Sequence, residues 1–84
     1  MANASGQKPN AVEIQDNYIT LFDYAGGTNI VYFGKAAPGS ATSDASWFIK
    51  KITYDANDNI LTIKIANDTA SFDKIWDSRT TYTY

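Results

Sequence analysis

The sequence predicts an all-β protein, either a small antiparallel β-sandwich or a partly open β-barrel, with one short helical segment near 72–78. Two observations lead to this fold class. Short stretches of alternating apolar and polar residues, rich in β-branched and aromatic side chains, are separated by turns rich in Gly, Asn and Asp. Only one stretch has the spacing of a helix. We assign residues 1–11 to an extended N-terminal arm and residues 12–84 to a single β domain.

In the first half of the domain, residues 11–15 predict a short strand, which a turn at Asp16-Asn17 ends. Residues 18–24 and 29–35 predict a β-hairpin, because Gly26-Gly27 between them supplies the backbone freedom of a tight turn. Both predicted hairpin strands carry apolar side chains on both faces, as in a strand that is covered on both sides.

Residues 36–45 have no periodicity and predict a loop, and residues 47–55 predict the next strand. Its apolar residues change phase, since Trp47 and Ile49 share one face while Ile52 falls on the other under strict alternation. We expect a β-bulge at Lys50-Lys51 that returns them to one side. The alternative is a strand that changes the layer it faces.

Residues 55–59 are rich in Asp and Asn and predict a hairpin turn, with only a passing likeness to a calcium loop. The following strand, 60–65, alternates cleanly. We expect its apolar residues Leu61, Ile63 and Ile65 to point inward, and Thr62 and Lys64 to point outward.

The last part of the chain predicts a helical segment and a terminal strand. Phe72, Ile75 and Trp76 have the i, i+3, i+4 spacing of an apolar helix face. Residues 80–84 alternate Thr with Tyr and predict a strand with an open edge, which is available for pairing with another chain.

Composition limits the sources of stability. A domain of 84 residues buries only about 60% of its unfolded surface, so its own core is marginal. The chain has no Cys and no His, which removes disulfides and the commonest zinc ligands. We therefore expect burial against other chains, in which aromatic residues, 14% of the sequence, take part.

Charge and hydropathy argue against several partners. The net charge is −2 and the basic residues are scattered, so we expect no nucleic-acid partner. No apolar run is long enough to span a bilayer, and we expect no membrane contact. The first ten residues lack the apolar core of a signal peptide, which predicts a protein that is not secreted.

No motif predicts catalysis, a metal or a cofactor, and we expect a protein that is not an enzyme. Asp73 and Asp77 lie four residues apart, but Lys74 and Arg79 beside them favour a solvated ion-pair face over a catalytic carboxylate pair. Trp47 and Trp76 are the candidates for stacking on sugar rings, which leaves a small glycan- or receptor-binding module as the alternative function. Their periodicity favours a core position instead.

Three stretches carry a resemblance to a known family: YFGKAAPGS at 32–40, SWFIKKI at 46–52 and FDKIWDSR at 72–79. Together with the β-prone terminus, over about residues 32–84, they resemble small virion structural proteins of tailed bacteriophages. The resemblance implies a particle component made in the host cytoplasm and located in the virion. Capsid decoration, a head-tail neck or adaptor, and fibre anchoring are all compatible with it.

This resemblance implies contacts with other virion proteins and with copies of the chain, in a homo-oligomer within a larger assembly. Phe48 stands where the family pattern leads us to expect a polar residue, and it marks a candidate contact with another subunit. The arm 1–11, the loop 36–45 and the segment 80–84 would add area to such contacts. The residues we predict at interfaces are Phe48, Tyr82, Tyr84, Pro38, Gly39, Lys8 and Pro9.

Overall fold

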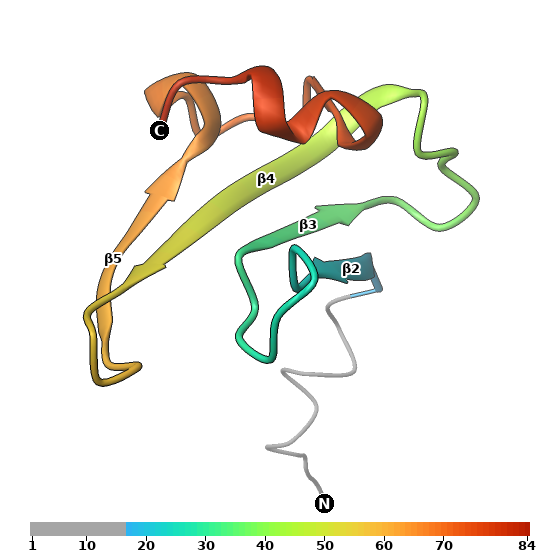
Figure 1. Cartoon of the computed structure of the whole chain (residues 1–84). Helices are drawn as coiled ribbons and strands as arrows, with labels where there is room; N and C mark the ends of the chain where they lie inside the picture. Colours follow the sequence, from blue (N-terminus) through green and yellow to red (C-terminus); the bar gives the residue numbers. More distant parts are fainter. Residues whose placement is uncertain (1–16) are drawn as a thin grey trace, which may run out of the picture.

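The structure is a computed structural model that describes residues 17–84, and these residues form one open antiparallel sheet (Figure 1). Four strands follow each other in chain order, and a short fifth strand pairs with the start of the central one. The all-β prediction is confirmed, and the sheet is not closed into a barrel. The arm 1–11 and the strand expected at 11–15 lie outside the described residues. The strands are β2 (Ile19–Asp23), β3 (Tyr32–Ala36), β4 (Ala45–Tyr54), β5 (Ile60–Ile65) and β6 (Lys74–Ile75).

The predicted hairpin is confirmed as β2 and β3, which pair in register from Ile19 opposite Ala36 to Asp23 opposite Tyr32. At the tip of its loop, Ala25 and Gly26 have positive φ angles of 50° and 80°. These are backbone conformations that glycine adopts at little cost. The loop is longer than a two-residue turn, since β3 begins only at Tyr32.

The β-bulge expected at Lys50-Lys51 is wrong. β4 pairs with β3 without interruption there, with Tyr32 opposite Lys51 and Phe33 opposite Lys50. The register shift lies further along, between Thr53 and Tyr54. Unbroken alternation therefore places Ile52 on the opposite face from Ile49, so β4 does change the layer that its apolar residues face.

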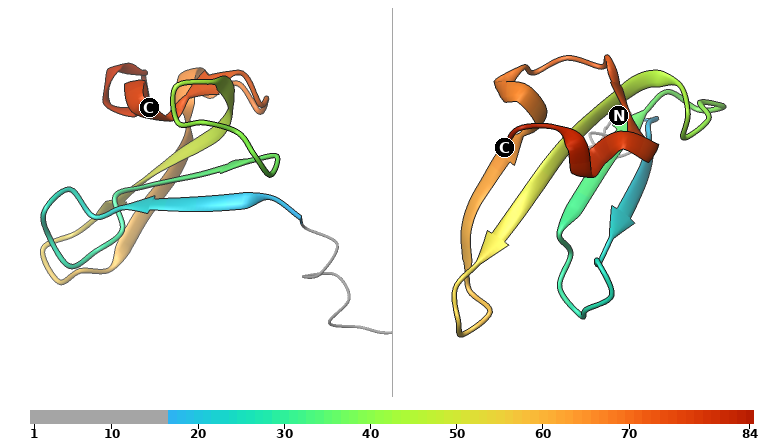
Figure 2. Two further views of the ribbon diagram at one scale, coloured as in Figure 1. Left: turned by 90° about the vertical axis from the view of Figure 1, so that its right-hand side faces the viewer. Right: turned by 45° about the horizontal axis from the view of Figure 1, so that its top comes forward.

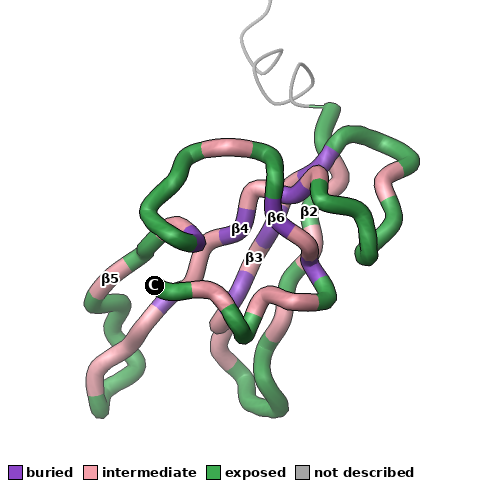
Figure 3. The backbone as a smooth tube through the Cα atoms, turned by 90° about the horizontal axis from the view of Figure 1, so that it is seen from above, coloured by how far each residue is buried: buried purple, intermediate pink, exposed green. Residues whose placement is uncertain are grey.

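The core lies on one face of the middle of the sheet, where the buried parts of β3, β4 and β6 meet (Figure 3). Trp47 and Ile49 of β4 are 1% and 0% exposed. The rings of Trp47 and Trp76 pack with their centroids 5.9 Å apart. We call this side the core face. Its buried cluster consists of Tyr32, Ala36, Trp47, Ile49, Ala66 and Trp76.

The C-terminal segment covers the core face, but not as the predicted helix over 72–78. Residues Lys74–Ile75 are extended, because they pair with Ala45 and Trp47 of β4. The helical part is the 3₁₀ helix η2, Trp76–Thr81, which lies across the sheet (Figure 2). Trp76 at its start packs directly over Gly34, where an added Cβ would lie 2.9 Å from the indole ring. Gly34 therefore leaves the space that the indole occupies.

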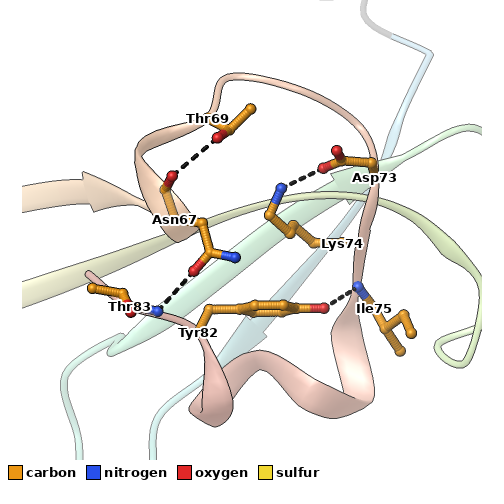
Figure 4. Close-up of polar contacts among 7 residues, drawn as sticks. All are labelled: Asn67, Thr69, Asp73, Lys74, Ile75, Tyr82 and Thr83. Carbon is orange, nitrogen blue, oxygen red and sulfur yellow. Dashed lines mark hydrogen bonds and ion pairs between the residues drawn. The ribbon is translucent and has the colours of Figure 1, made fainter.

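The strand expected at 80–84 is also wrong. After η2 the chain folds back onto its own core, where a turn of 3₁₀ helix, η1 (Ala66–Asp68), follows β5. The N–H of Asn67 donates to the Thr83 carbonyl at 2.7 Å, and the Thr83 N–H donates to the Asn67 side-chain oxygen at 2.9 Å (Figure 4). The Tyr82 hydroxyl accepts a hydrogen bond from the Ile75 N–H at 2.8 Å. These bonds hold the last residues against the domain.

Arg79 joins the C-terminal segment to the β2–β3 hairpin. Its Nε donates to the carboxylate of Asp23 at 2.7 Å, and its guanidinium lies 4.7 Å from the centre of the Trp76 ring. The pKa of Asp23 is held below its ordinary value, chiefly by the hydrogen bond from the Ala25 N–H and then by the one from Arg79. This ion pair thus ties η2, which covers the core face, to the last residue of β2.

Candidate functional site

The second face of the sheet carries apolar side chains, several of which no described element covers, and we call it the open face; Ile52, at 8% exposed, is its buried member. In an antiparallel pair, residues directly opposite each other point to the same side. Phe22 faces Phe33, Lys35 faces Phe48, and Ile52 faces Ile63. The side chains that share the open face are those of Thr20, Phe22, Phe33, Lys35, Phe48, Lys50, Ile52, Ile63 and Ile65.

Aromatic rings and lysines alternate at the centre of this face. The register places Phe33 opposite Lys50, and Lys35 opposite Phe48. The Lys50 ammonium lies 5.9 Å from the centre of the Phe33 ring and 5.5 Å from that of Phe48. These four side chains line a hollow of about 150 Å³. At this range ammonium groups and rings attract one another, by about 0.5–1 kcal/mol when exposed.

Two more rings extend the open face beyond the end of the central strands. Phe72 packs edge-on against Phe48, with centroids 5.3 Å apart, and Tyr18 lies 5.0 Å from Phe72. Both remain accessible, since Tyr18 is 47% and Phe72 is 41% exposed. The open face therefore carries a continuous aromatic row that runs from β4 to the first described residues.

The strand β5 is an outer strand with exposed apolar side chains. Leu61 is 62% and Ile63 is 51% exposed, and Ile60 is also exposed. The prediction that Leu61, Ile63 and Ile65 point into the core is wrong. Ile63 and Ile65 point to the open face, while Thr62 contacts Thr53 of β4 through a hydroxyl–hydroxyl hydrogen bond.

The predicted interface residues are distributed over both faces. Phe48 lies half-buried on the open face, and Pro38 and Gly39 are exposed in the loop between β3 and β4. Tyr82 and Tyr84 pack against the core face. The Tyr84 ring lies 5.6 Å from that of Tyr32, and burial raises the pKa of Tyr84 to about 12. The remaining two predicted residues, Lys8 and Pro9, lie outside the described residues.

The tryptophans and the acidic residues that we considered for chemistry have structural contacts. Trp47 donates from Nε1 to the Ala41 carbonyl at 2.9 Å and is buried with Trp76, so neither ring offers a flat exposed surface to a sugar. Asp73 forms an ion pair with Lys74, which lowers the pKa of Asp73. Lys74 is itself buried, which corrects the expectation of a fully solvated ion-pair face.

The Asp-rich turn at 55–59 is organised by its own hydrogen bonds. The Asp55 carboxylate accepts hydrogen bonds from the backbone N–H groups of Asn57 and Asn59, at 2.8 and 3.0 Å, and these bonds lower the pKa of Asp55. Within residues 17–84 no three acidic side chains gather in the way that a metal site requires. The hydrogen bonds around Asp55 give residues 55–59 the form of a hairpin turn, as their Asx composition predicts.

Sequence reasoning singled out Phe48 but missed the partners that make the open face a site: Phe22, Phe33, Lys35, Lys50, Phe72 and Tyr18. The sequence did contain a signal for the open face, because both predicted hairpin strands carry apolar residues on two faces. This pattern was interpreted as burial of both faces. Which face is covered depends on the position of residues 74–84. That position is set by contacts between residues that are far apart in the sequence.

Comparison with known proteins does not identify a relative. No family model matches the chain, and no curated protein or solved structure matches it either. In the part of the chain that the structure describes, no helix has both the length and the apolar character needed to cross a membrane.

Proposed function

We propose that the protein is a structural subunit of a bacteriophage particle, which acts by burying surface against neighbouring subunits. The proposal gives it no catalytic step, cofactor, nucleic-acid partner or membrane contact, and it locates the protein in the virion. The sequence patterns at 32–40, 46–52 and 72–79 support the phage context, because they resemble virion structural proteins.

The single observation that carries the proposal is the exposed apolar surface of the open face and of the adjoining strand β5. Phe22, Leu61 and Ile63 are each more than half exposed. Contiguous apolar patches on soluble monomers are usually small, and larger ones mark interaction sites. An outer strand with apolar side chains is also a template for pairing with another chain.

The physical mechanism is the transfer of this surface from water into a contact. Stable interfaces bury about 1,200–2,000 Å² in total and concentrate aromatic residues at their centre. The aromatic row of the open face fits the centre of such a contact. The exposed loop with Pro38 and Gly39 fits its rim.

The test measures the native mass of the full chain by light scattering, together with its incorporation into particles. We expect an oligomer or particle-bound chain. The substitution Ile63→Lys should weaken association by about tenfold or more, because it places a charge in a desolvated contact. Ala56→Lys, at the exposed tip of the β4–β5 hairpin, adds the same charge outside the apolar surface and serves as the matched control.

Three results would overturn the proposal. The first is a strictly monomeric chain that no particle incorporates. The second is equal incorporation of the Ile63→Lys and Ala56→Lys variants and the unchanged protein. The third is saturable sugar binding by the isolated monomer, which would instead favour the glycan-binding alternative.

A further inference from the structure

The outer edge of β5 has no neighbouring strand within residues 17–84. β5 is the last strand in the order of the sheet, and it lies at one side of the sheet in the right-hand view of Figure 2. Its side chains are also poorly covered, since Ile60, Leu61 and Ile63 are 56%, 62% and 51% exposed. An edge of this kind is a template for pairing with another chain, because its outer N–H and C=O groups have no strand beside them.

The hydrogen bonds of β4 show which backbone groups of β5 point outward. The N–H of Ile52 donates to the Val31 carbonyl at 2.8 Å, so the backbone groups of Ile52 point toward β3. These directions alternate along an antiparallel strand, so the groups of Lys51 point toward β5, where Lys51 lies opposite Lys64. Lys64 and Thr62 therefore bond inward to β4. The residues of β5 whose backbone groups point outward are Leu61, Ile63 and Ile65.

The same three residues form an apolar row on one face. Ile63 lies opposite Ile52 and shares the open face with it, and alternation places Leu61 and Ile65 on that side. Lys64 is the one charged residue of β5, and it points to the other face. The edge therefore combines free backbone groups, an apolar row and a single positive charge. A strand with this pattern can match a copy of itself, if the register keeps the two lysines from lying opposite each other.

We propose that a second copy of this chain pairs with this edge, in an antiparallel β5–β5 contact that is centred on Ile63. A two-fold axis perpendicular to the sheet relates the two copies. Ile63 then lies opposite Ile63 of the second copy, Leu61 lies opposite Ile65, and Thr62 lies opposite Lys64. The inference rests on the proposed function, because it names one partner for the subunit contacts that this function requires.

The backbone and the charge of β5 select this register over its neighbours. Centred on Ile63, the contact pairs the outward groups of all three outward residues. Centred on Lys64, it would place the two lysines directly opposite each other, which destabilises a sheet. Centred on Thr62, it would place Ile65 opposite Asn59, whose carbonyl is already bonded within the turn. A shift by one residue would bring open-face side chains of one copy beside core-face side chains of the other.

This contact joins the open faces of the two copies. Because the axis is perpendicular to the sheet, both open faces lie on the same side, and the apolar row of β5 is at the seam between them. Exposed Leu61 and Ile63 gain cross-strand neighbours there. The chain leaves the edge directly after Ile65, since Ala66 is buried in the core cluster. The dimer would therefore present a continuous apolar surface to the other subunits.

Disulfide crosslinking of the isolated full chain tests the register. The chain contains no Cys, so a single introduced cysteine can form a disulfide only with a second copy. Ile63→Cys places two thiols opposite each other with their Cα atoms about 5.5 Å apart, which a disulfide can bridge. It should crosslink at least about tenfold faster than Ala56→Cys, at the exposed tip of the β4–β5 hairpin. Thr62→Cys, which faces Lys64 in this register, should also crosslink slowly.

Amide hydrogen exchange gives a second measurement on the unchanged protein. The N–H groups of Leu61, Ile63 and Ile65 should exchange at least about tenfold more slowly at high than at low protein concentration, because only the dimer bonds them. The N–H groups of Thr62 and Lys64, which point to β4, should be protected at both concentrations. Alternate residues of one strand thus serve as test and control.

Fast crosslinking of Ile63→Cys, together with outward amides whose protection rises with concentration, supports the inference. Equal crosslinking of Ile63→Cys and Ala56→Cys, faster crosslinking of Thr62→Cys, or outward amides whose exchange does not depend on concentration overturns it. Both measurements use the isolated chain, whereas the proposed function is tested by incorporation into particles. Incorporation without β5 pairing would refute this inference alone, and a β5-paired dimer that no particle incorporates would count against the proposed function alone.

Discussion

The two faces of the sheet have similar apolar content but opposite surroundings. The core face receives η2 and the C-terminal residues, which bury Trp47, Ile49 and Trp76. On the open face no described element covers Phe22 or Ile63, and both remain more than half exposed. The difference comes from a single chain reversal after β5, which places residues 74–84 over one side only.

This contrast shows why composition alone does not identify an interface. Aromatic and β-branched residues are favoured in strands, and here they occur on both faces, so their presence does not tell which face is covered. The polar neighbours distinguish the faces. On the core face Arg79 is paired with Asp23, whereas at the centre of the open face the Lys50 ammonium lies over the rings of Phe33 and Phe48.

The largest expected difference in unfolding free energy is between replacing a buried ring and replacing an exposed one. Trp47→Ala should lower the free energy of unfolding by about 3–5 kcal/mol, because it leaves a cavity in the core. Phe22→Ala, at an aromatic residue of the open face, should cost about 1 kcal/mol or less. Denaturant unfolding of the full-length variants measures both values. If Phe22→Ala cost as much as Trp47→Ala, the open face would be buried in the isolated chain and the contrast would be wrong.

A smaller effect is expected where the cover of the core face touches the sheet. Gly34→Ala puts a methyl group 2.9 Å from the Trp76 ring and should lower the free energy of unfolding by about 1–3 kcal/mol. Gly27→Ala is the matched control, since its added Cβ would meet only the Tyr24 carbonyl at an ordinary 3.5 Å. Equal effects of the two substitutions on unfolding would mean that Trp76 does not press on Gly34.

Local features of the fold could be predicted from the sequence. The β2–β3 hairpin follows from alternation around a Gly-Gly pair, and the turn at 55–59 follows from Asp55 and its Asn neighbours. In both cases the residues that determine the structure are close in the chain. The strand 60–65 was placed with the correct bounds for the same reason.

The errors concern contacts between distant segments. A bulge at Lys50-Lys51 was expected because one core was assumed to gather all the apolar residues of β4. The structure instead buries Trp47 and leaves Ile52 on the other face. The helix expected around Phe72 and Trp76 does not form, because Lys74 and Ile75 pair with β4 as a strand. The open face was visible only as an excess of apolar residues, since the location of its cover is not encoded locally.

The smallest expected effect is at alkaline pH. It concerns Tyr84, which belongs to the C-terminal residues that cover the core face. Burial raises the pKa of Tyr84 to about 12 from its ordinary value of 10.0, while Arg79 opposes the rise. The neutral phenol donates to the Arg79 carbonyl at 2.8 Å, and the Lys51 ammonium lies 5.9 Å from the ring. A raised pKa means that the fold favours the protonated form. Its contribution to stability is therefore complete below about pH 10 and is lost as the pH rises toward about 12.

The measurement is the free energy of unfolding as a function of pH over this range, for the unchanged protein and for Tyr84→Phe. The variant keeps the ring beside Tyr32 but has no proton to lose, so its stability should fall less steeply between about pH 10 and 12. Tyr24→Phe, at an exposed tyrosine in the β2–β3 loop, should keep the slope of the unchanged protein. Identical slopes for the Tyr84→Phe variant and the unchanged protein would mean that the last residue is not buried against the core face.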